Sequence, residues 1–173
     1  MNNKPILVVA GEPYSVFLEL FFKAKKKYFK KPIILIASKK LVICQMKKLN
    51  FNFEINLINK NNINFNNLNK KKINLIDVNF DFNKIFDKIT DKSNFYINES
   101  FEIALKILKK NKCSGLINGP ISKKNFLKER YLGITEYLAA KTKTKNKVAM
   151  LIYNKKLSVS PITTHLPLKL VSK

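Results

Sequence analysis

The chain has 173 residues, a length that suits one ordinary domain with a sizeable core. Its 34 basic and 11 acidic residues give a net charge of +23, which by itself favours a polyanionic partner, yet Arg130 is the only arginine. Specific nucleic-acid recognition relies on the bidentate guanidinium, so lysines spread along the whole chain argue against that function. We interpret the abundance of Lys, Asn, Ile and Phe as a result of an AT-rich coding sequence, so that the high charge is a background property rather than a binding site.

The sequence carries no pattern typical of export, membrane insertion or a disulfide framework. The apolar start at 6–10 is too short for a signal peptide, and no apolar run approaches the ~20 residues of a membrane span. Cys44 and Cys113 lack the close spacing of metal ligands, so we expect buried thiols rather than a disulfide. We therefore expect a cytoplasmic protein with no membrane contact.

Short apolar runs alternate with helical patterns from the start of the chain, which is typical of β-α units and a largely parallel sheet. Ile6–Ala10 is expected to be a buried strand, and Ser15 is placed to cap the helix that follows it. A second strand is expected at Ile33–Ala37. Ser38 is then placed to cap a helix that runs to about Leu49.

The segment 50–69 holds ten asparagines in twenty residues. Asparagine competes for backbone hydrogen bonds and favours turns, so we expect a long surface excursion with at most one short strand near 53–58. A third strand is expected at Ile73–Val78. The clearest helical stripe is Phe101–Lys110, and we expect that helix to begin at Asn98 or Ser100.

The last third of the chain continues the alternation. We expect a short strand at 116–118, a helix near 123–128 capped by Ser122, and a helix at 135–141. Strands at 148–153 and 157–161 are expected to pair around a turn at 154–156. Lys123 then follows a strand's carboxyl end, where ligands of open α/β sheets gather.

Four short motifs stand out along the chain. The first is Leu7-Val8-Val9-Ala10-Gly11-Glu12-Pro13, and the others are Ile117-Asn118-Gly119-Pro120-Ile121-Ser122-Lys123, Gly133-Ile134-Thr135-Glu136-Tyr137 and Thr163-Thr164-His165-Leu166-Pro167-Leu168. His165 is the only histidine. A neutral imidazole is a good metal ligand, although a lone His beside apolar residues is more often structural.

The order of these motifs resembles the 4-hydroxythreonine-4-phosphate dehydrogenase family of vitamin B6 biosynthesis. Its members carry Gly-Pro-x-x-Lys, Gly-His-Thr-Glu and Thr-Thr-His-Leu-Pro-Leu in this order, after a Gly-Glu/Asp-Pro turn. The family is about twice as long, so the resemblance implies an N-terminal half. The chain departs from the family in two places: Tyr14-Ser15-Val16-Phe17 replaces a glycine-containing segment, and Ile134 stands where the family has His.

The resemblance implies an α/β fold similar to isocitrate and isopropylmalate dehydrogenases, with two subdomains and a cleft between them. Residues 1–122 would form the first subdomain, and residues 123–173 would begin a second that is incomplete in this chain. The family resemblance also implies a homodimer.

The resemblance assigns His165 as one of three histidines that bind a divalent cation (Zn, Mg or Co), with the other two downstream. Thr135, and Ile134 by position, would contact a phosphorylated small-molecule substrate. An alternative for Thr135 is a helix N-cap with Glu136 in the first turn. Lys123 and Glu12 are candidates to which the resemblance assigns no role.

The implied reaction is oxidation of 4-phosphooxy-L-threonine by NAD or NADP, followed by decarboxylation. A metal would polarise the C–O bond and stabilise the enolate. A single histidine cannot hold such an ion, so we expect the chain alone to be inactive. Two alternatives stay open: a degenerate paralogue that binds a phosphorylated small molecule without oxidising it, and a basic nucleic-acid-binding protein supported by charge alone.

Overall fold

The computed structural model describes residues 4–27, 29, 31–128, 130–144, 147–163 and 167–171. The chain divides into two compact units, Met1–Lys128 and Glu129–Lys173. The subdomain boundary expected after residue 122 concerns a complete enzyme and stays a prediction. Among the described residues, no helix has both the length and the apolar character that crossing a membrane requires.

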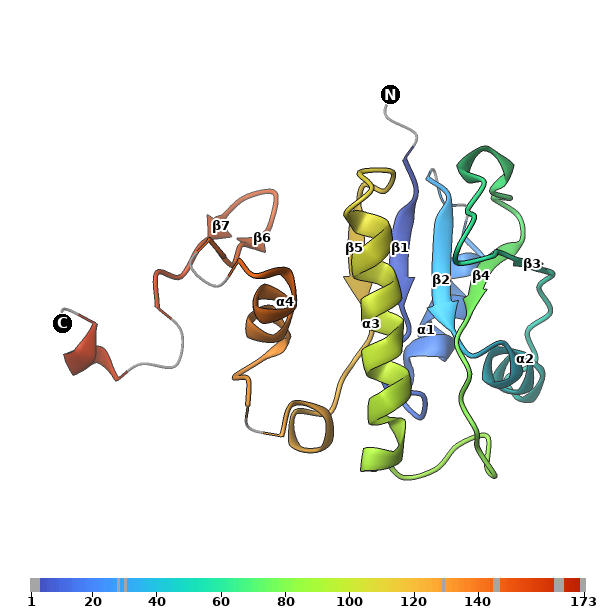
Figure 1. The fold of residues 1–173 in the computed structure, drawn as a ribbon, viewed down its shortest axis with the longest axis horizontal. Coiled ribbons are helices and arrows are strands. Elements are labelled where there is room, and N and C mark those ends of the chain that lie inside the picture. The colour runs from blue at the N-terminus through green and yellow to red at the C-terminus, as the bar shows by residue number, and fades with distance from the viewer. Residues whose placement is uncertain are drawn as a thin grey trace. The chain divides into compact units, whose positions relative to one another are not determined.

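A five-stranded parallel sheet forms the centre of the first unit (Figure 1). The strands lie in the order β3-β4-β2-β1-β5, and their bounds are β1 (Ile6–Val9), β2 (Ile33–Ala37), β3 (Ile55–Leu57), β4 (Ile73–Asp77) and β5 (Gly115–Asn118). Apolar runs such as Ile-Leu-Val-Val suit strands covered on both faces. The parallel α/β sheet predicted from the sequence is confirmed.

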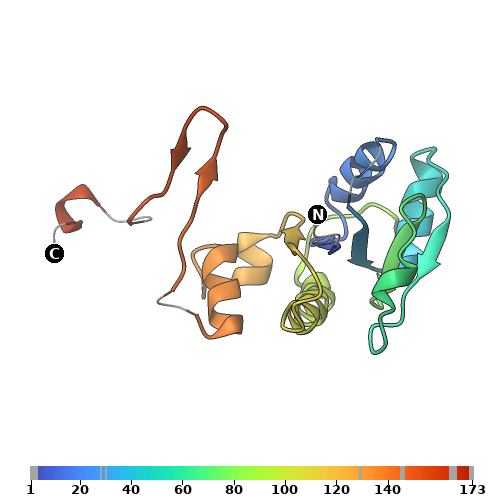
Figure 2. The same cartoon turned by 90° about the horizontal axis from the view of Figure 1, so that it is seen from above.

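Helices cover both faces of this sheet. α1 (Phe17–Lys25) and α2 (Lys39–Lys48) pack together on one face, whereas α3 (Asn94–Leu108) lies over β5, β1 and β2 on the other (Figures 1 and 2). The chain runs from β1 through β2 to β3 at one edge, steps back to β4, and then passes β2 and β1 to reach β5 at the other edge. Because parallel crossovers are right-handed, this reversal places α3 on the opposite face from α1 and α2.

The core is formed by strand residues and by apolar side chains from the helices on both faces, including one fully buried phenylalanine from each helical layer. Leu7 and Leu35 are fully buried in the sheet, Phe22 of α1 is fully buried on one face, and Phe101 of α3 is fully buried as well. Burying each such side chain contributes roughly 1.5–3 kcal/mol. The sheet is therefore held firmly enough to fix the loops at its carboxyl edge.

Two predicted caps have different outcomes. Ser38 caps α2 as expected, because its Oγ accepts a hydrogen bond from the backbone N–H of Leu41 at 3.4 Å. The N-cap of α1 is Val16 instead of Ser15. Ser15 nevertheless contributes to this helix start, because its Oγ accepts from the backbone N–H of Phe17 at 3.3 Å while donating to the carbonyl oxygen of Glu12 at 2.7 Å.

α3 begins at Asn94, earlier than the predicted start at Asn98 or Ser100. A 3₁₀ turn at Asp91–Ser93, capped by the Thr90 side chain, runs directly into the helix. The added first turn buries Tyr96 and Ile97. The Asn and Ser that favoured a later start are both inside the helix.

The asparagine-rich excursion is anchored to the sheet by Asn74 of β4. Asn74 Oδ1 accepts hydrogen bonds from Asn56 Nδ2 and from the backbone N–H of Asn69, both at 2.9 Å. Its Nδ2 donates to the carbonyl oxygens of Ile33 and Asn69. The predicted excursion with one short strand, β3, is confirmed.

The second unit contains α4 (Ile134–Thr142) and a two-stranded antiparallel ribbon of β6 (Ile152–Tyr153) and β7 (Ser158–Val159). The predicted helix and strand pair are both present, although the strands are shorter than expected. Ahead of α4 in the chain, Lys123–Leu127 forms a π-helical turn. Ser122 caps this turn, because its Oγ accepts a hydrogen bond from the backbone N–H of Asn125 at 3.1 Å. Both cysteines are free thiols and half-buried.

Candidate functional site

Two loops lock together at the carboxyl ends of β1 and β5. Gly11 has a φ of +75°, and a Cβ there would lie 2.3 Å from the carbonyl oxygen of Pro120. A Cβ on Gly119 would lie 2.1 Å from the carbonyl oxygen of Ala10. This approach lets the backbone N–H of Glu12 donate to the Pro120 oxygen at 2.8 Å. The two glycines therefore fix the loop that carries Glu12.

Glu12 is the buried acid of this edge, with 2% of its surface exposed. The Ser93 hydroxyl donates to its Oε2 at 3.0 Å, whereas Oε1 has no hydrogen-bond partner among the described residues. Burial raises the pKa of this carboxyl, against the opposing effect of the bonds from Ser93 and the Tyr14 backbone. Burial therefore favours the protonated form of Glu12 more in the folded chain than in the unfolded one.

Polar contacts join this acid to the turn that carries Lys123. Asn94, the first residue of α3, donates from Nδ2 to the carbonyl oxygen of Asn125 at 2.8 Å. Asn125 in turn lies in the π-helical turn capped by Ser122. Lys123 is exposed at the start of that turn. Lys123 therefore stays a candidate without an assigned role.

Sequence reasoning missed two buried polar residues at the same edge. Gln45 donates from Nε2 to the carbonyl oxygens of Pro13, at 3.0 Å, and Ile85, at 3.1 Å. The Tyr96 hydroxyl accepts from the Ser38 backbone at 3.3 Å, and burial raises its pKa. A glutamine on the apolar face of a predicted helix was an available signal for the first. No sequence signal pointed to Tyr96, because it lies before the predicted start of its helix.

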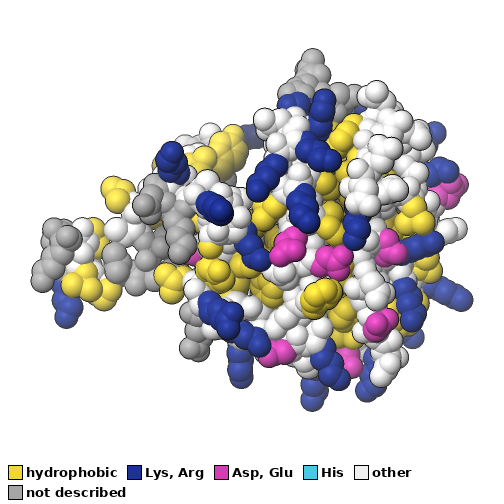
Figure 3. Space-filling view, in the orientation of Figure 1, with side chains coloured by type: hydrophobic (Ala, Val, Ile, Leu, Met, Phe, Trp, Pro, Cys, Tyr) yellow, Lys and Arg dark blue, Asp and Glu magenta, His cyan; other side chains and the backbone are white. Residues whose placement is uncertain are grey.

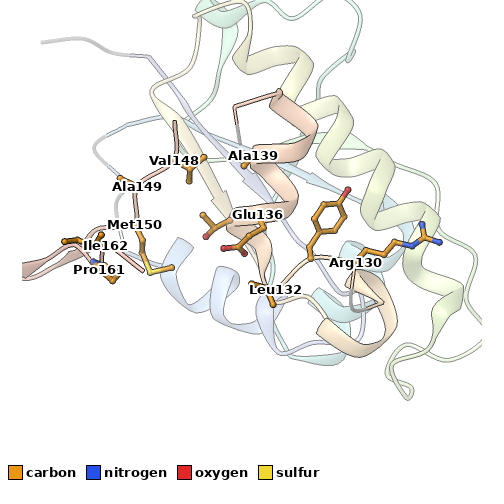
Figure 4. Close-up of a pocket in the computed structure, with 11 residues that line it drawn as sticks. Arg130, Leu132, Glu136, Ala139, Val148, Ala149, Met150, Pro161 and Ile162 are labelled. Carbon is orange, nitrogen blue, oxygen red and sulfur yellow. The ribbon is translucent and has the colours of Figure 1, made fainter. Parts of the chain in front are cut away.

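The second unit contains a pocket of about 430 Å³ beside α4 (Figure 4). Thr135 and Glu136 line it from the first turn of the helix, and Met150 and Ile162 line it from the segments around the ribbon. The guanidinium of Arg130 points away from Glu136 in Figure 4. A predicted substrate residue, Thr135, thus lies in a real concavity.

The start of α4 is capped by Gly133, so Thr135 is in the first turn and is not the N-cap. A Cβ on Gly133 would lie 3.1 Å from Oε2 of Glu136. The Glu136 carboxylate therefore folds back over the start of the helix, where the helix dipole favours negative charge. Thr135 and Glu136 thus share the first turn of α4, and both line the pocket.

The other predicted site residues do not join this pocket in the described part of the chain. Ile134 begins α4 and is half-buried, but it is not among the residues that line the pocket. His165 lies outside the described residues. Within the described ranges, no three His, Cys, Asp or Glu side chains lie close enough to hold a metal ion. The described residues alone do not fit a divalent cation.

Comparison with known proteins identifies the family. The family described as "Pyridoxal phosphate biosynthetic protein PdxA" matches residues 29–173. The chain belongs to the PdxA family. The 4-hydroxythreonine-4-phosphate dehydrogenase of Sulfurihydrogenibium sp. is 32% identical over 169 residues, and that of Wigglesworthia glossinidia brevipalpis is 23% identical over 171 residues.

Solved PdxA structures share the fold. A 4-hydroxythreonine-4-phosphate dehydrogenase from Klebsiella pneumoniae superposes with a TM-score of 0.79 at 22% identity, over 96% of this chain and 52% of that one. The 4-hydroxythreonine-4-phosphate dehydrogenase from Burkholderia phymatum superposes with a TM-score of 0.77 at 20% identity, over 95% of this chain and 51% of that one. The matches to Sulfurihydrogenibium and Wigglesworthia cover 95% and 97% of this chain but 50% and 51% of those proteins. The chain thus spans about half the length of the relatives it matches.

Proposed function

We propose that this chain is the N-terminal half of an NAD(P)-dependent dehydrogenase that oxidises and decarboxylates 4-phosphooxy-L-threonine in vitamin B6 biosynthesis. The observation that carries this proposal is the match of the PdxA family to residues 29–173. Relatives that bear the name 4-hydroxythreonine-4-phosphate dehydrogenase support it over almost the whole chain. We also propose that the complete enzyme is a cytoplasmic homodimer, with subdomains that meet near residue 122.

The pocket beside α4 suggests how this half would contribute to substrate binding. Thr135 offers a hydroxyl that can donate or accept a hydrogen bond at the start of the helix. Because the Glu136 carboxylate already lies at that helix end, it would repel a phosphate. We therefore assign Thr135 to a substrate hydroxyl rather than to the phosphate.

We propose that the remaining metal ligands come from the other half of the enzyme. The family resemblance assigns His165 as one of three histidine ligands of a divalent cation. Among the described residues, no three possible ligand side chains lie close together. NAD or NADP supplies the hydride acceptor when it is bound.

A second candidate function follows from Ile134. An isoleucine cannot make the hydrogen bond of the family's histidine, and Tyr14-Ser15-Val16-Phe17 replaces its glycine-containing segment. These departures favour a paralogue that binds a phosphorylated small molecule without oxidising it.

One experiment separates the two candidates. Residues 1–173 are joined to the second half of the Sulfurihydrogenibium relative, and NADH or NADPH formation from 4-phosphooxy-L-threonine is followed by absorbance. The dehydrogenase proposal expects turnover by the joined chain and none by residues 1–173 alone. Turnover that appears only after Ile134→His, with substrate binding already present, would establish the paralogue instead. Thr135→Ala in the joined chain should raise the KM by about 10-fold, the loss expected for one hydrogen bond.

A further inference from the structure

The amino ends of the strands carry a second pocket, at the opposite edge of the sheet from the loop that holds Glu12. Its volume is about 890 Å³, within the range of small-molecule sites, and it lies wholly in the first unit. Four residues that line it come just before four parallel strands: Lys4 before β1, Pro32 before β2, Lys70 before β4 and Lys112 before β5. The parallel sheet therefore brings these four segments together.

The pocket is lined by three lysines and no acidic residue. Within the described part of the chain, no ion pair joins Lys4, Lys70 or Lys112 to a carboxylate, whereas Lys60 of the same excursion pairs with Glu99 at 3.2 Å. Dark-blue lysine side chains are visible around this end of the first unit (Figures 1 and 3). Ammonium groups around one cavity repel one another, so an anion bound between them would remove that repulsion.

One wall of the pocket is the asparagine-rich excursion, and its backbone is held by specific hydrogen bonds. Asn64 caps the short 3₁₀ turn that follows it, because its Oδ1 accepts from the backbone N–H of Asn66 at 3.1 Å. The ammonium of Lys25, in α1, donates to the carbonyl oxygen of Lys70. The excursion is thus fastened at both the turn and the residue that carries a pocket lysine.

The opposite wall is fastened by Ser114. Its backbone N–H donates to the carbonyl oxygen of Pro5 at 2.8 Å, and its hydroxyl donates to the carbonyl oxygen of Lys4 at 2.9 Å. These bonds fix the backbone of Lys4 beside the segment that carries Lys112. Both walls exist before any ligand binds, which lowers the ordering cost of binding.

Amide groups and one aromatic ring complete the lining. Asn62, Asn64 and Asn66 are exposed there, and Phe65 between them is half-buried. An asparagine amide both donates and accepts hydrogen bonds, and a phenylalanine ring offers a flat face on which a base can stack. Lysine is a compact cation that binds phosphate groups. The lining therefore suits phosphate groups beside a planar polar group.

We propose that this pocket binds a small anion with a chain of phosphate groups, either a nucleoside triphosphate or an inorganic polyphosphate. The ammonium groups of Lys4, Lys70 and Lys112 hold the phosphates, and a base, where the ligand has one, lies against Phe65. The site is separate from the pocket that contains Thr135, so the proposal does not rest on the proposed function. The high net charge alone would not create such a site, whereas three unpaired lysines around one cavity do.

The test measures binding of tripolyphosphate and of ATP to residues 1–173 by isothermal titration calorimetry. A salt concentration of ~150 mM screens charges more than about 8 Å apart, so attraction to the chain as a whole is reduced. Lys70→Gln together with Lys112→Gln should weaken binding of both ligands by on the order of 10-fold or more, because charged hydrogen bonds to phosphate are lost. Phe65→Ala should weaken ATP alone if the ligand is a nucleotide and neither probe if it is an inorganic polyphosphate.

The matched control is Lys47→Gln together with Lys48→Gln. Both lysines are exposed in α2, outside the pocket lining, and their substitution removes the same charge. The affinity for tripolyphosphate should stay unchanged. An equal loss with the control, or no loss with the changes at 70 and 112, would overturn the proposal.

Thermal unfolding separates a lost site from a damaged fold. Without ligand, Lys70→Gln with Lys112→Gln should unfold at the same temperature as the unchanged chain or higher, because repulsion between the lysines is reduced. Tripolyphosphate should raise the unfolding temperature of the unchanged chain and of the control, since a ligand that binds only the folded state stabilises it. An equal rise for the variant changed at 70 and 112 would show that the anion binds elsewhere and that the proposal is wrong.

Discussion

Ser93 donates its hydroxyl to Oε2 of Glu12 at 3.0 Å, across 81 residues of sequence. This bond ties the Gly-Glu-Pro loop after β1 to the residue that precedes α3. Because Gly119 packs against Ala10 in the same region, the loops after β1 and β5 and the start of α3 form one buried polar corner. The carboxyl edge of the sheet is thus fixed by specific polar contacts as well as by apolar packing.

Ser93→Ala should destabilise the chain by about 1–3 kcal/mol, because it removes the donor of a buried carboxyl. The free energy of unfolding in urea measures this loss. Ser158→Ala, at an exposed serine of the ribbon, is the matched control and should change stability by less than about 0.5 kcal/mol. Equal effects of the two substitutions would show that the Ser93 bond contributes nothing specific.

The stability of the chain should also depend on the ionisation of Glu12. Burial raises its pKa in the folded state above the value of 4.5 expected when unfolded. At any pH between the unfolded-state pKa and the folded-state pKa of Glu12, the folded state then binds more protons than the unfolded state. The Glu12 contribution is therefore present in full below pH 4.5 and is lost as the pH rises through the folded pKa.

Glu12→Gln should remove this dependence. The difference in unfolding free energy between Glu12→Gln and the unchanged chain, measured in urea from acidic to neutral pH, isolates it from other groups. Glu54 makes stability change with pH in the opposite direction, because its bond to Lys72 lowers its pKa. Since Glu54 is present in both chains, its effect cancels when the two unfolding free energies are subtracted. A difference that stays constant with pH would mean that the Glu12 pKa is the same in both states.

Gly11→Ala and Gly119→Ala should each destabilise the chain by about 1–3 kcal/mol, the usual cost of overpacking. Both new methyl groups would meet backbone oxygens that cannot move without separating the two loops. Gly115→Ala is the control, since a Cβ at that glycine of β5 meets nothing within 4 Å. Gly115→Ala should unfold at about the same temperature as the unchanged chain, whereas the other two variants should unfold at lower temperatures. A comparable loss at Gly115 would contradict the locked-loop interpretation.

The sequence predicted the sheet and most of its helices because local signals agree with the fold there. The apolar runs at 6–10 and 33–37 become β1 and β2, and Ser38 caps α2 as its position indicated. The start of α3 was missed because it depends on packing of Tyr96 and Ile97 against the sheet. Such packing is a tertiary effect that a local cap signal does not contain.

The candidate site was predictable only where a motif carried it. The Gly-Ile-Thr-Glu motif made Thr135 a candidate, and the structure shows that Thr135 lines a pocket, but its contact with substrate stays a prediction. Nothing in the sequence indicated that Gly133 would leave room for Glu136 to fold back. Glu12 was a candidate through its motif alone. Its partner Ser93 could not be inferred, because the contact joins segments brought together by the fold.

His165 is the residue on which the proposed chemistry depends most. In residues 1–173 joined to the second half of the Sulfurihydrogenibium relative, His165→Ala should weaken divalent-metal binding by on the order of 10-fold or more, since loss of a ligand costs at least as much as loss of a residue that only orients one. Metal content after dialysis, measured by mass spectrometry, checks this. Lys155→Ala, in the exposed turn of the ribbon, should retain the metal. Full metal content in the His165→Ala chain would show that the ion is bound elsewhere and that the assignment of His165 is wrong.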